Sequence, residues 1–228
     1  MILGPALIAI EGLDAAGKNT QSKLLCGRLE KTGSEVAFYS FPRYETPLGV
    51  HIKEFLNGSL SLHRNDLDER DLMAWAPSNN HAWAFIYQCM MNLDKYDADV
   101  DIKRCLGAGR VVVCDRWTAS AIAYGISDGL SRDWLERCRS SLTKADLTIF
   151  LSVSEEEARR RRPKLRDRYE KDREKQQVVA DNYRSMLSAD ASWVLVDGES
   201  HTGDLSDDVA IVHERIWAVV QERLGVSS

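Results

Sequence analysis

A glycine-bounded loop near the start of the chain carries the residue types best suited to chemistry. Residues 6–10 are apolar strand formers, residues 12–17 begin and end with glycine, and Lys18 opens a stretch with helical spacing of leucines. Backbone N–H groups in such a loop, and at the start of the helix after it, converge on one point and carry partial positive charge. The lysine adds a full charge, so the spacing predicts a loop that binds the β- and γ-phosphates of a nucleotide.

The predicted nucleotide-binding residues are consecutive, but they depart from the usual pattern at one position. A P-loop usually has serine or threonine directly after its lysine, where the hydroxyl holds Mg²⁺. Here a threonine comes one position late, so either the side-chain oxygen of Asn19 is a Mg²⁺ ligand or the metal is held elsewhere. A glycine turn that binds nothing is the alternative, which the strand–loop–helix context disfavours. The full set is Gly12, Leu13, Asp14, Ala15, Ala16, Gly17, Lys18, Asn19 and Thr20.

A second candidate lies where the apolar residues 111–114 are followed by Asp115 and Arg116. A carboxylate at the end of a buried strand can hold Mg²⁺ directly or through water. A guanidinium next to it can direct several donors at a phosphate, although a surface ion pair is the alternative for this arginine.

Most residues between 159 and 168 are basic. Such a run is usually a solvated face or a nucleic-acid patch, but the net charge of −5 argues against a nucleic-acid partner. The loop at 12–17 contains no arginine, so this segment is the nearest source of one that neutralises transition-state charge. We therefore predict a basic lid at about 155–170 that closes over phosphates. Its candidate residues are Arg159, Arg162, Lys164, Arg166 and Arg168.

The composition is that of an ordinary globular protein, with 228 residues, 44% hydrophobic and 29% charged. This length is enough for one large α/β domain, which we place at 1–228. No apolar run approaches the ~18 residues of a membrane span, and the N-terminal segment lacks the basic region of a signal peptide. The five cysteines are scattered without a C-x-x-C pair. We therefore expect reduced thiols, a cytoplasmic location and no membrane partner.

Apolar strand-like segments alternate with helical patterns along the whole chain. This alternation is typical of βαβ units, so we expect a parallel sheet covered by helices on both faces. Ligands of such sheets gather at the carboxyl ends of the strands. The expected strands are 6–11, 35–41, 111–115, 147–153 and 193–197, and the expected helices are 18–31, 46–57, 67–107, 116–140, 155–190 and 205–224.

Four segments together resemble the thymidylate kinase family, whose members phosphorylate dTMP with ATP. They are E-G-L-D-A-A-G-K-N-T-Q at 11–21, F-P-R-Y-E-T-P-L-G at 41–49, D-R-W-T-A-S-A-I-A-Y at 115–124 and D-R-Y-E-K-D at 167–172. The resemblance implies a three-layer α/β P-loop kinase fold with a five-stranded parallel sheet and a basic lid. It also implies ATP as phosphoryl donor, Mg²⁺ as cofactor, small nucleotides as partners and a homodimer.

The resemblance also implies roles for residues on the acceptor side. Asp14 matches the carboxylate that bonds the sugar 3′-hydroxyl, and Arg43 and Arg116 match the pair that holds the monophosphate. Phe41 matches a wall of the nucleoside pocket, and Tyr124 matches the aromatic residue that disfavours a ribose hydroxyl at C2′.

Four further residues belong to the implied nucleoside site. Ser120 lies one helical turn before the aromatic residue near C2′ and is a candidate contact to the base. Met91 and Lys95 stand where the family usually has an aromatic residue and an arginine facing the thymine. The replacements at Met91 and Lys95 affect base specificity more than the class of reaction. Tyr169, which follows the lid, is the fourth of these residues.

Catalysis in this interpretation is positioning and charge neutralisation, because the acceptor phosphate is already anionic. The implied catalytic residues are Lys18, Arg116, Asp14 and one lid arginine, represented by Arg166. The candidate metal ligands are Asp14, Asn19, Asp115 and Glu170.

Three other functions compete with this interpretation. A GTPase is suggested by Thr143-Lys144-Ala145-Asp146, but this motif precedes the expected strand 147–153 instead of following it. Another small-molecule P-loop kinase is disfavoured by the two arginines directed at an acceptor phosphate. A regulatory protein that binds nucleotide without turnover is the third alternative, with Asn19 as its defect.

Overall fold

The computed structural model describes residues 3–57, 59, 81–161 and 173–225. Its centre is a five-stranded sheet in the order β2-β3-β1-β4-β5, and every neighbouring pair of strands is parallel. The expected parallel α/β architecture is therefore confirmed. The strands are β1 (Ala6–Glu11), β2 (Val36–Ser40), β3 (Val111–Asp115), β4 (Leu147–Ser152) and β5 (Trp193–Asp197).

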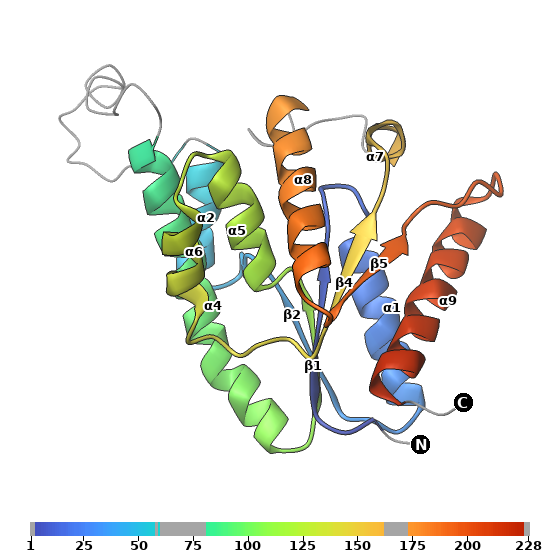
Figure 1. Cartoon of the computed structure of the whole chain (residues 1–228). Coiled ribbons are helices and arrows are strands. Elements are labelled where there is room, and N and C mark those ends of the chain that lie inside the picture. The colour runs from blue at the N-terminus through green and yellow to red at the C-terminus, as the bar shows by residue number, and fades with distance from the viewer. Residues whose placement is uncertain (1–2, 58, 60–80, 162–172, 226–228) are drawn as a thin grey trace.

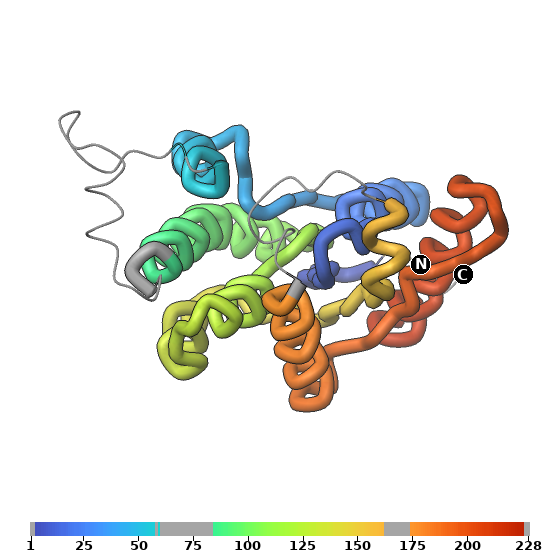
Figure 2. The backbone as a smooth tube through the Cα atoms, turned by 90° about the horizontal axis from the view of Figure 1, so that it is seen from above, coloured from blue at the N-terminus to red at the C-terminus, as the bar shows by residue number. Residues whose placement is uncertain are grey.

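Helices cover both faces of this sheet (Figure 1). In the view from above, α1 and α9 lie on one side of the strands, and α4, α5 and α8 lie on the other (Figure 2). The helices are α1 (Lys18–Lys31), α2 (Pro47–Leu56), α4 (His81–Gly107), α5 (Thr118–Ser127), α6 (Arg132–Arg139), α7 (Glu155–Arg161), α8 (Arg173–Ala189) and α9 (Leu205–Leu224). None of the helices in the described ranges has the length and apolar composition needed to cross a bilayer.

The central strand β1 has core on both of its faces, because all six of its residues are buried. Ile8 and Ile10 belong to the core cluster under α1 and α9, whereas Leu7 and Ala9 belong to the cluster under α4. A parallel strand buried on both sides is a continuous apolar run, which is why the sequence pattern located β1 to the residue.

One predicted helix is wrong. The pattern over 116–140 predicts a continuous helix, but the structure has α5 and α6 with a break between them. Gly129 adopts a φ of +85° in this break, a left-handed conformation that glycine adopts readily. The start of the helix expected at 67–107 and the middle of the one expected at 155–190 lie outside the described residues.

The strand ends bring three polar side chains to one edge of the sheet. Ser40 and Ile10 both pair with Asp115, so the ends of β2, β3 and β1 are in register. Glu11 is the last residue of β1, and the glycine loop begins directly after it. The site expected at the carboxyl edge is therefore assembled by sheet register.

Helix α4 buries a lysine in the core beside β3. Lys95 is fully buried, and its Nζ lies 3.4 Å from the Met91 carbonyl oxygen and 5.9 Å from the centre of the Phe41 ring. Burial lowers the pKa of Lys95 from 10.5 to about 8, against the opposing influence of Glu11 and Asp94. The folded protein thus holds this ammonium at a cost in stability below pH 8.

Replacing Lys95 by methionine should stabilise the protein near neutral pH. The folded-state pKa lies below the unfolded one, so the unfolded chain binds more protons between pH 8 and 10.5. The free energy of unfolding should therefore rise with pH in this window for the unmodified protein. Lys95→Met should remove that contribution and raise stability at neutral pH, on the order of 3 kcal/mol. Urea unfolding across this pH range measures both effects, and a variant that is less stable with an unchanged pH profile would refute the assignment.

Candidate active site

The glycine loop has the backbone conformation of an anion-binding cradle. Gly12 and Gly17 have φ values of +153° and +94°, and Ala15 lies between them at +62°. A Cβ on Gly12 would lie 2.5 Å from the Leu151 carbonyl oxygen, so this position requires glycine. Gly17 is the N-cap of α1 and no side chain caps that helix end. The first amides of α1 therefore point toward the loop.

Lys18, the first residue of α1, extends back toward this loop. Its side chain is buried, and Nζ donates to the Leu13 carbonyl oxygen at 2.5 Å. Burial and the nearby Arg116 lower the pKa of Lys18 to about 8, while Asp14 and Asp115 oppose that shift.

Arg116 lies across the loop from Lys18. Its Nη2 forms an ion pair with Asp14 Oδ1, and its Nη1 donates to the Gly12 carbonyl oxygen at 3.2 Å. The Tyr124 hydroxyl donates to the other oxygen of Asp14 at 3.0 Å. Burial raises the pKa of Tyr124 well above its usual range, so this hydroxyl remains a donor. Three of the predicted residues thus form one hydrogen-bonded group.

Asp115 is the carboxylate best placed for a metal ion. Its Oδ2 accepts hydrogen bonds from Asn19 Nδ2 at 3.0 Å and from Ser40 Oγ at 2.9 Å. Asp14, by contrast, has its two oxygens on Arg116 and Tyr124. Among the described residues there is no cluster of three or more His, Cys, Asp or Glu side chains that could hold a metal ion.

Two cavities meet at this group of residues. The larger has a volume of about 680 Å³ and is lined by residues 14–21, Phe41, Asp115 and Arg161, among others. The smaller has a volume of about 80 Å³ and includes Tyr87, Met91 and Tyr124. Both are lined by Asp14, Pro42, Tyr44 and Arg116. The Arg116–Asp14 pair therefore forms a wall shared by two adjoining binding spaces.

The structure separates the other predicted acceptor residues into two groups. Met91, Ser120 and Tyr124 line the smaller cavity, and Phe41 lines the larger one with its ring 5.1 Å from that of Trp117. The Ser120 hydroxyl, however, donates to Glu11 Oε2 at 2.6 Å, so it is engaged away from any base.

Arg43 and Lys95 differ more from their predicted positions, because neither lines these two cavities. Arg43 Nε donates to Asp94 Oδ1 at 2.8 Å, and its Nη2 donates to Asp97 Oδ2 at 2.7 Å. Lys95 is enclosed in the core behind the Phe41 ring. Carboxylates on α4 hold Arg43 in this structure, and sequence spacing gave no indication of that ion pair.

The basic segment contributes a residue that sequence analysis missed. Arg161 Nη1 donates to the Ala16 carbonyl oxygen at 3.2 Å, and Nη2 donates to the Gly198 carbonyl oxygen at 2.7 Å. The buried carboxylate of Glu157, one turn earlier, accepts from Arg161 Nε at 2.6 Å and fixes the arginine over the loop. Charge alone cannot distinguish it from its basic neighbours.

The other predicted lid residues are not brought to the loop by the described part of the chain. Arg159 is half exposed and pairs with Glu155 at 2.8 Å, within its own helix. The remaining lid and acceptor residues lie outside the described residues: Arg162, Lys164, Arg166, Arg168, Tyr169 and Glu170.

Comparison with known proteins agrees with this geometry. A family model described as thymidylate kinase matches residues 10–209. The thymidylate kinase of Dictyostelium discoideum is 27% identical over 97% of this chain and 90% of its own, and the probable thymidylate kinase of Thermococcus kodakarensis is 29% identical over 96% and 98%. The solved structure of the Candida albicans thymidylate kinase has a TM-score of 0.74 at 25% identity, covering 97% of this chain and 93% of that one. The chain therefore belongs to the thymidylate kinase family and has its P-loop fold.

Proposed function

We propose that this protein transfers the γ-phosphoryl group of ATP to dTMP, giving dTDP and ADP as a step toward dTTP. Family membership supports the reaction. The observation in this chain that supports two-substrate phosphoryl transfer is the wall between the two cavities. Asp14 and Arg116 line both of them. Two nucleotides bound in these spaces would present their phosphates to the same guanidinium.

On the donor side, backbone amides of the loop and of the α1 N-terminus hold the β- and γ-phosphates, together with Lys18. Arg161 adds a guanidinium at the edge of the same cavity. Asp115, with Asn19 beside it, would hold Mg²⁺, which when bound neutralises charge on the phosphates. The lid of about 155–170 remains part of this proposal, with one of its arginines completing the charge neutralisation.

On the acceptor side, the monophosphate lies against Arg116, with Asp14 placed to accept from a sugar hydroxyl. Tyr124 fills the space beside that hydroxyl, and Met91 covers the base. The acceptor phosphate is anionic, so its oxygen attacks phosphorus without a base, and catalysis rests on in-line placement and charge.

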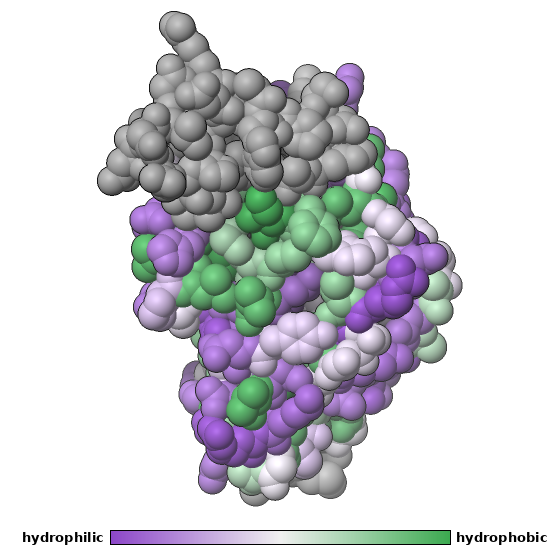
Figure 3. All heavy atoms as spheres, turned by 90° about the vertical axis from the view of Figure 1, so that its left-hand side faces the viewer, coloured by the Kyte–Doolittle hydropathy of each residue, from purple (hydrophilic) through white to green (hydrophobic). Residues whose placement is uncertain are grey.

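We also propose that the protein forms a homodimer through the exposed face of α4. Phe85, Leu93 and Val100 are 47%, 58% and 60% exposed and follow one another at helical spacing. Figure 3 shows apolar side chains gathered on the side of the molecule that carries α2, α4 and α6. Apolar side chains this exposed in a row are typical of a protein interface.

A cytoplasmic location and a single kinase domain over 1–228 complete the proposal. All five cysteines are free thiols. Thiols without disulfides are usual in a reducing compartment such as the cytoplasm.

The reaction is tested by ADP release with dTMP, dUMP, dCMP, dGMP, dAMP and dTDP as acceptors. We expect release with dTMP above all others. Lys18→Met should reduce kcat/KM by about 10³-fold or more, because the charge on the transferring phosphoryl group loses its cation. Lys23→Met, which changes an exposed lysine on the same helix, is the matched control and should retain activity. Tight ATP binding without ADP release for any acceptor would favour a regulatory protein instead.

The dimer is tested by substituting a charge into the α4 face. Leu93→Glu should convert the dimer to a monomer in size-exclusion chromatography with light scattering, because a carboxylate would be buried without a partner. Leu24→Glu, at a 39% exposed leucine on α1, should remain dimeric. A monomeric unmodified protein, or a Leu93→Glu variant that still dimerises, would show that this face is not the interface.

A further inference from the structure

Glu11 is a fully buried carboxylate that none of the roles above uses. It is the last residue of β1 and directly precedes the glycine loop. It lines neither of the two cavities that meet at Arg116. Burial lowers the pKa values of Lys95 and Lys18 and the charge of Glu11 opposes that shift, but the direct hydrogen bonds of Glu11 are to other groups.

Glu11 accepts four hydrogen bonds, and the donors are the N-cap residue of α5, a residue of α5 and a residue of α8. Glu11 Oε1 accepts from the backbone N–H of Trp117 at 2.8 Å and from that of Ser120 at 3.3 Å. Its Oε2 accepts from Ser120 Oγ at 2.6 Å and from the Tyr183 hydroxyl at 3.0 Å. The carboxylate also occupies the helix N-terminus that would otherwise attract a phosphate.

This carboxylate caps α5 from another part of the chain. The N-cap residue of α5 is Trp117, whose own side chain makes no capping hydrogen bond. Glu11, 106 residues away in sequence, satisfies that amide instead. The start of α5 is thereby fixed to the end of β1.

Arg116 and Trp117 connect β3 to α5, and the backbone of Arg116 is constrained by the same attachment. Arg116 has a φ of +66°, which is unfavourable for a residue with a Cβ. Its N–H donates to the Ile10 carbonyl oxygen at 3.0 Å. Ile10 and Glu11 of β1 thus fasten two successive residues, Arg116 and Trp117, and hold the turn in this conformation.

We propose that Glu11 is a positioning residue for the acceptor phosphate: by capping α5 it holds Arg116 in the left-handed conformation that directs the guanidinium to the wall between the two cavities. This inference rests on the proposed function for the identity of the acceptor. Without the cap, the turn relaxes and the guanidinium no longer meets both Asp14 and the Gly12 carbonyl oxygen. The effect should be larger on the monophosphate than on ATP, because ATP is also held by Lys18 and by the amides of the loop.

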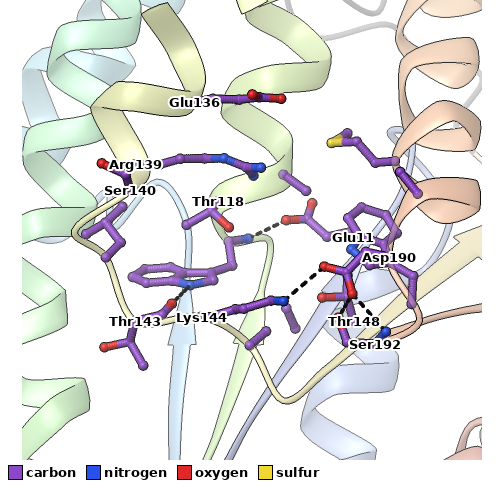
Figure 4. Close-up of a pocket in the computed structure, with 18 of the residues that line it drawn as sticks. Glu11, Thr118, Glu136, Arg139, Ser140, Thr143, Lys144, Thr148, Asp190 and Ser192 are labelled. Atoms are coloured by element: carbon purple, nitrogen blue, oxygen red, sulfur yellow. Dashed lines mark hydrogen bonds and ion pairs between the residues drawn. The ribbon is translucent and has the colours of Figure 1, made fainter. Parts of the chain in front are cut away.

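A third cavity, which we call the rear cavity, makes a direct test possible. It has a volume of about 450 Å³ and is lined by Glu11, Thr118, Arg139 and Trp193, among others. Figure 4 shows Glu11 at its inner end, with a dashed line to the backbone N–H that it accepts, and Arg139 extending into the same space. A small carboxylate entering here could replace a missing Glu11 side chain without passing through the nucleotide site.

Glu11→Ala should raise the Kd for dTMP and lower kcat, with a combined loss of roughly 10²-fold from misplacement of the guanidinium. The KM for ATP should change less than the Kd for dTMP. Formate or acetate should restore part of the loss in Glu11→Ala but none in Glu11→Gln, whose side chain fills the same space. Glu11→Gln keeps the side-chain volume and one acceptor oxygen, so it should show a smaller loss of dTMP affinity and kcat. If the alanine variant does not fold, the glutamine variant provides the same test. Tyr183→Phe, which removes one bond to Glu11 but neither bond to the α5 backbone, is the matched control and should lose less.

A double-mutant cycle separates positioning from general support of the fold. In an Arg116→Ala background, Glu11→Gln should cause no further loss of dTMP affinity, measured by calorimetry without turnover. Additive losses, or Glu11 variants that bind dTMP as the unmodified protein does, would overturn the inference. The proposed function fails separately if the unmodified protein does not phosphorylate dTMP.

Discussion

The ion pair between Arg116 and Asp14 is the interaction on which the rest of the site depends. It joins the turn after β3 to the glycine loop after β1, and both cavities are bounded by it. A buried charge is tolerated when it is paired and hydrogen-bonded, and here the guanidinium also meets a loop carbonyl and a tyrosine hydroxyl. The pair thereby fixes the distance between the donor and acceptor spaces before any ligand is present.

The three carboxylates near this edge of the sheet each have their own hydrogen-bond partners. None of them forms an ion pair with Lys18 among the described residues, so this ammonium is available to a phosphate. Glu11 is satisfied by the start of α5, Asp14 by Arg116 and Tyr124, and Asp115 by Asn19 and Ser40. Lys18 forms its hydrogen bond with a backbone carbonyl, and its pKa is lowered by burial and by the neighbouring arginine. Lys18 is therefore the cation whose pKa should rise most when an anionic nucleotide binds.

Sequence reasoning succeeded where the determinants are local. The apolar runs of β1 and β3, the glycines at either end of the loop and the helix after Lys18 are all set by residues close in sequence, and their bounds agree with the structure. The family resemblance rested on the same segments. Asp14, Arg116 and Tyr124, which come from two of these segments and were each assigned to the acceptor side, lie together in one hydrogen-bonded group.

The features that were missed depend on contacts between distant residues. The cap that Glu11 supplies to α5 spans 106 residues, and Arg161 reaches a loop carbonyl 145 residues away. The engagement of Arg43 by α4 has the same origin, because no local pattern tells which carboxylate will face an arginine. The break between α5 and α6 was missed for another reason. Gly125 lies inside α5 and Gly129 lies in the break, so a glycine among helix formers is compatible with either a continuous or an interrupted helix.

The central claim is that two nucleotides bind end to end across Arg116. A ligand in which adenosine and thymidine are joined 5′ to 5′ through a chain of phosphates tests it in one calorimetric competition experiment. We expect one such molecule to bind per chain and to be displaced by ATP and by dTMP alike. Displacement by only one of the two nucleotides would show that the cavities do not adjoin in this way, and the claim would be wrong.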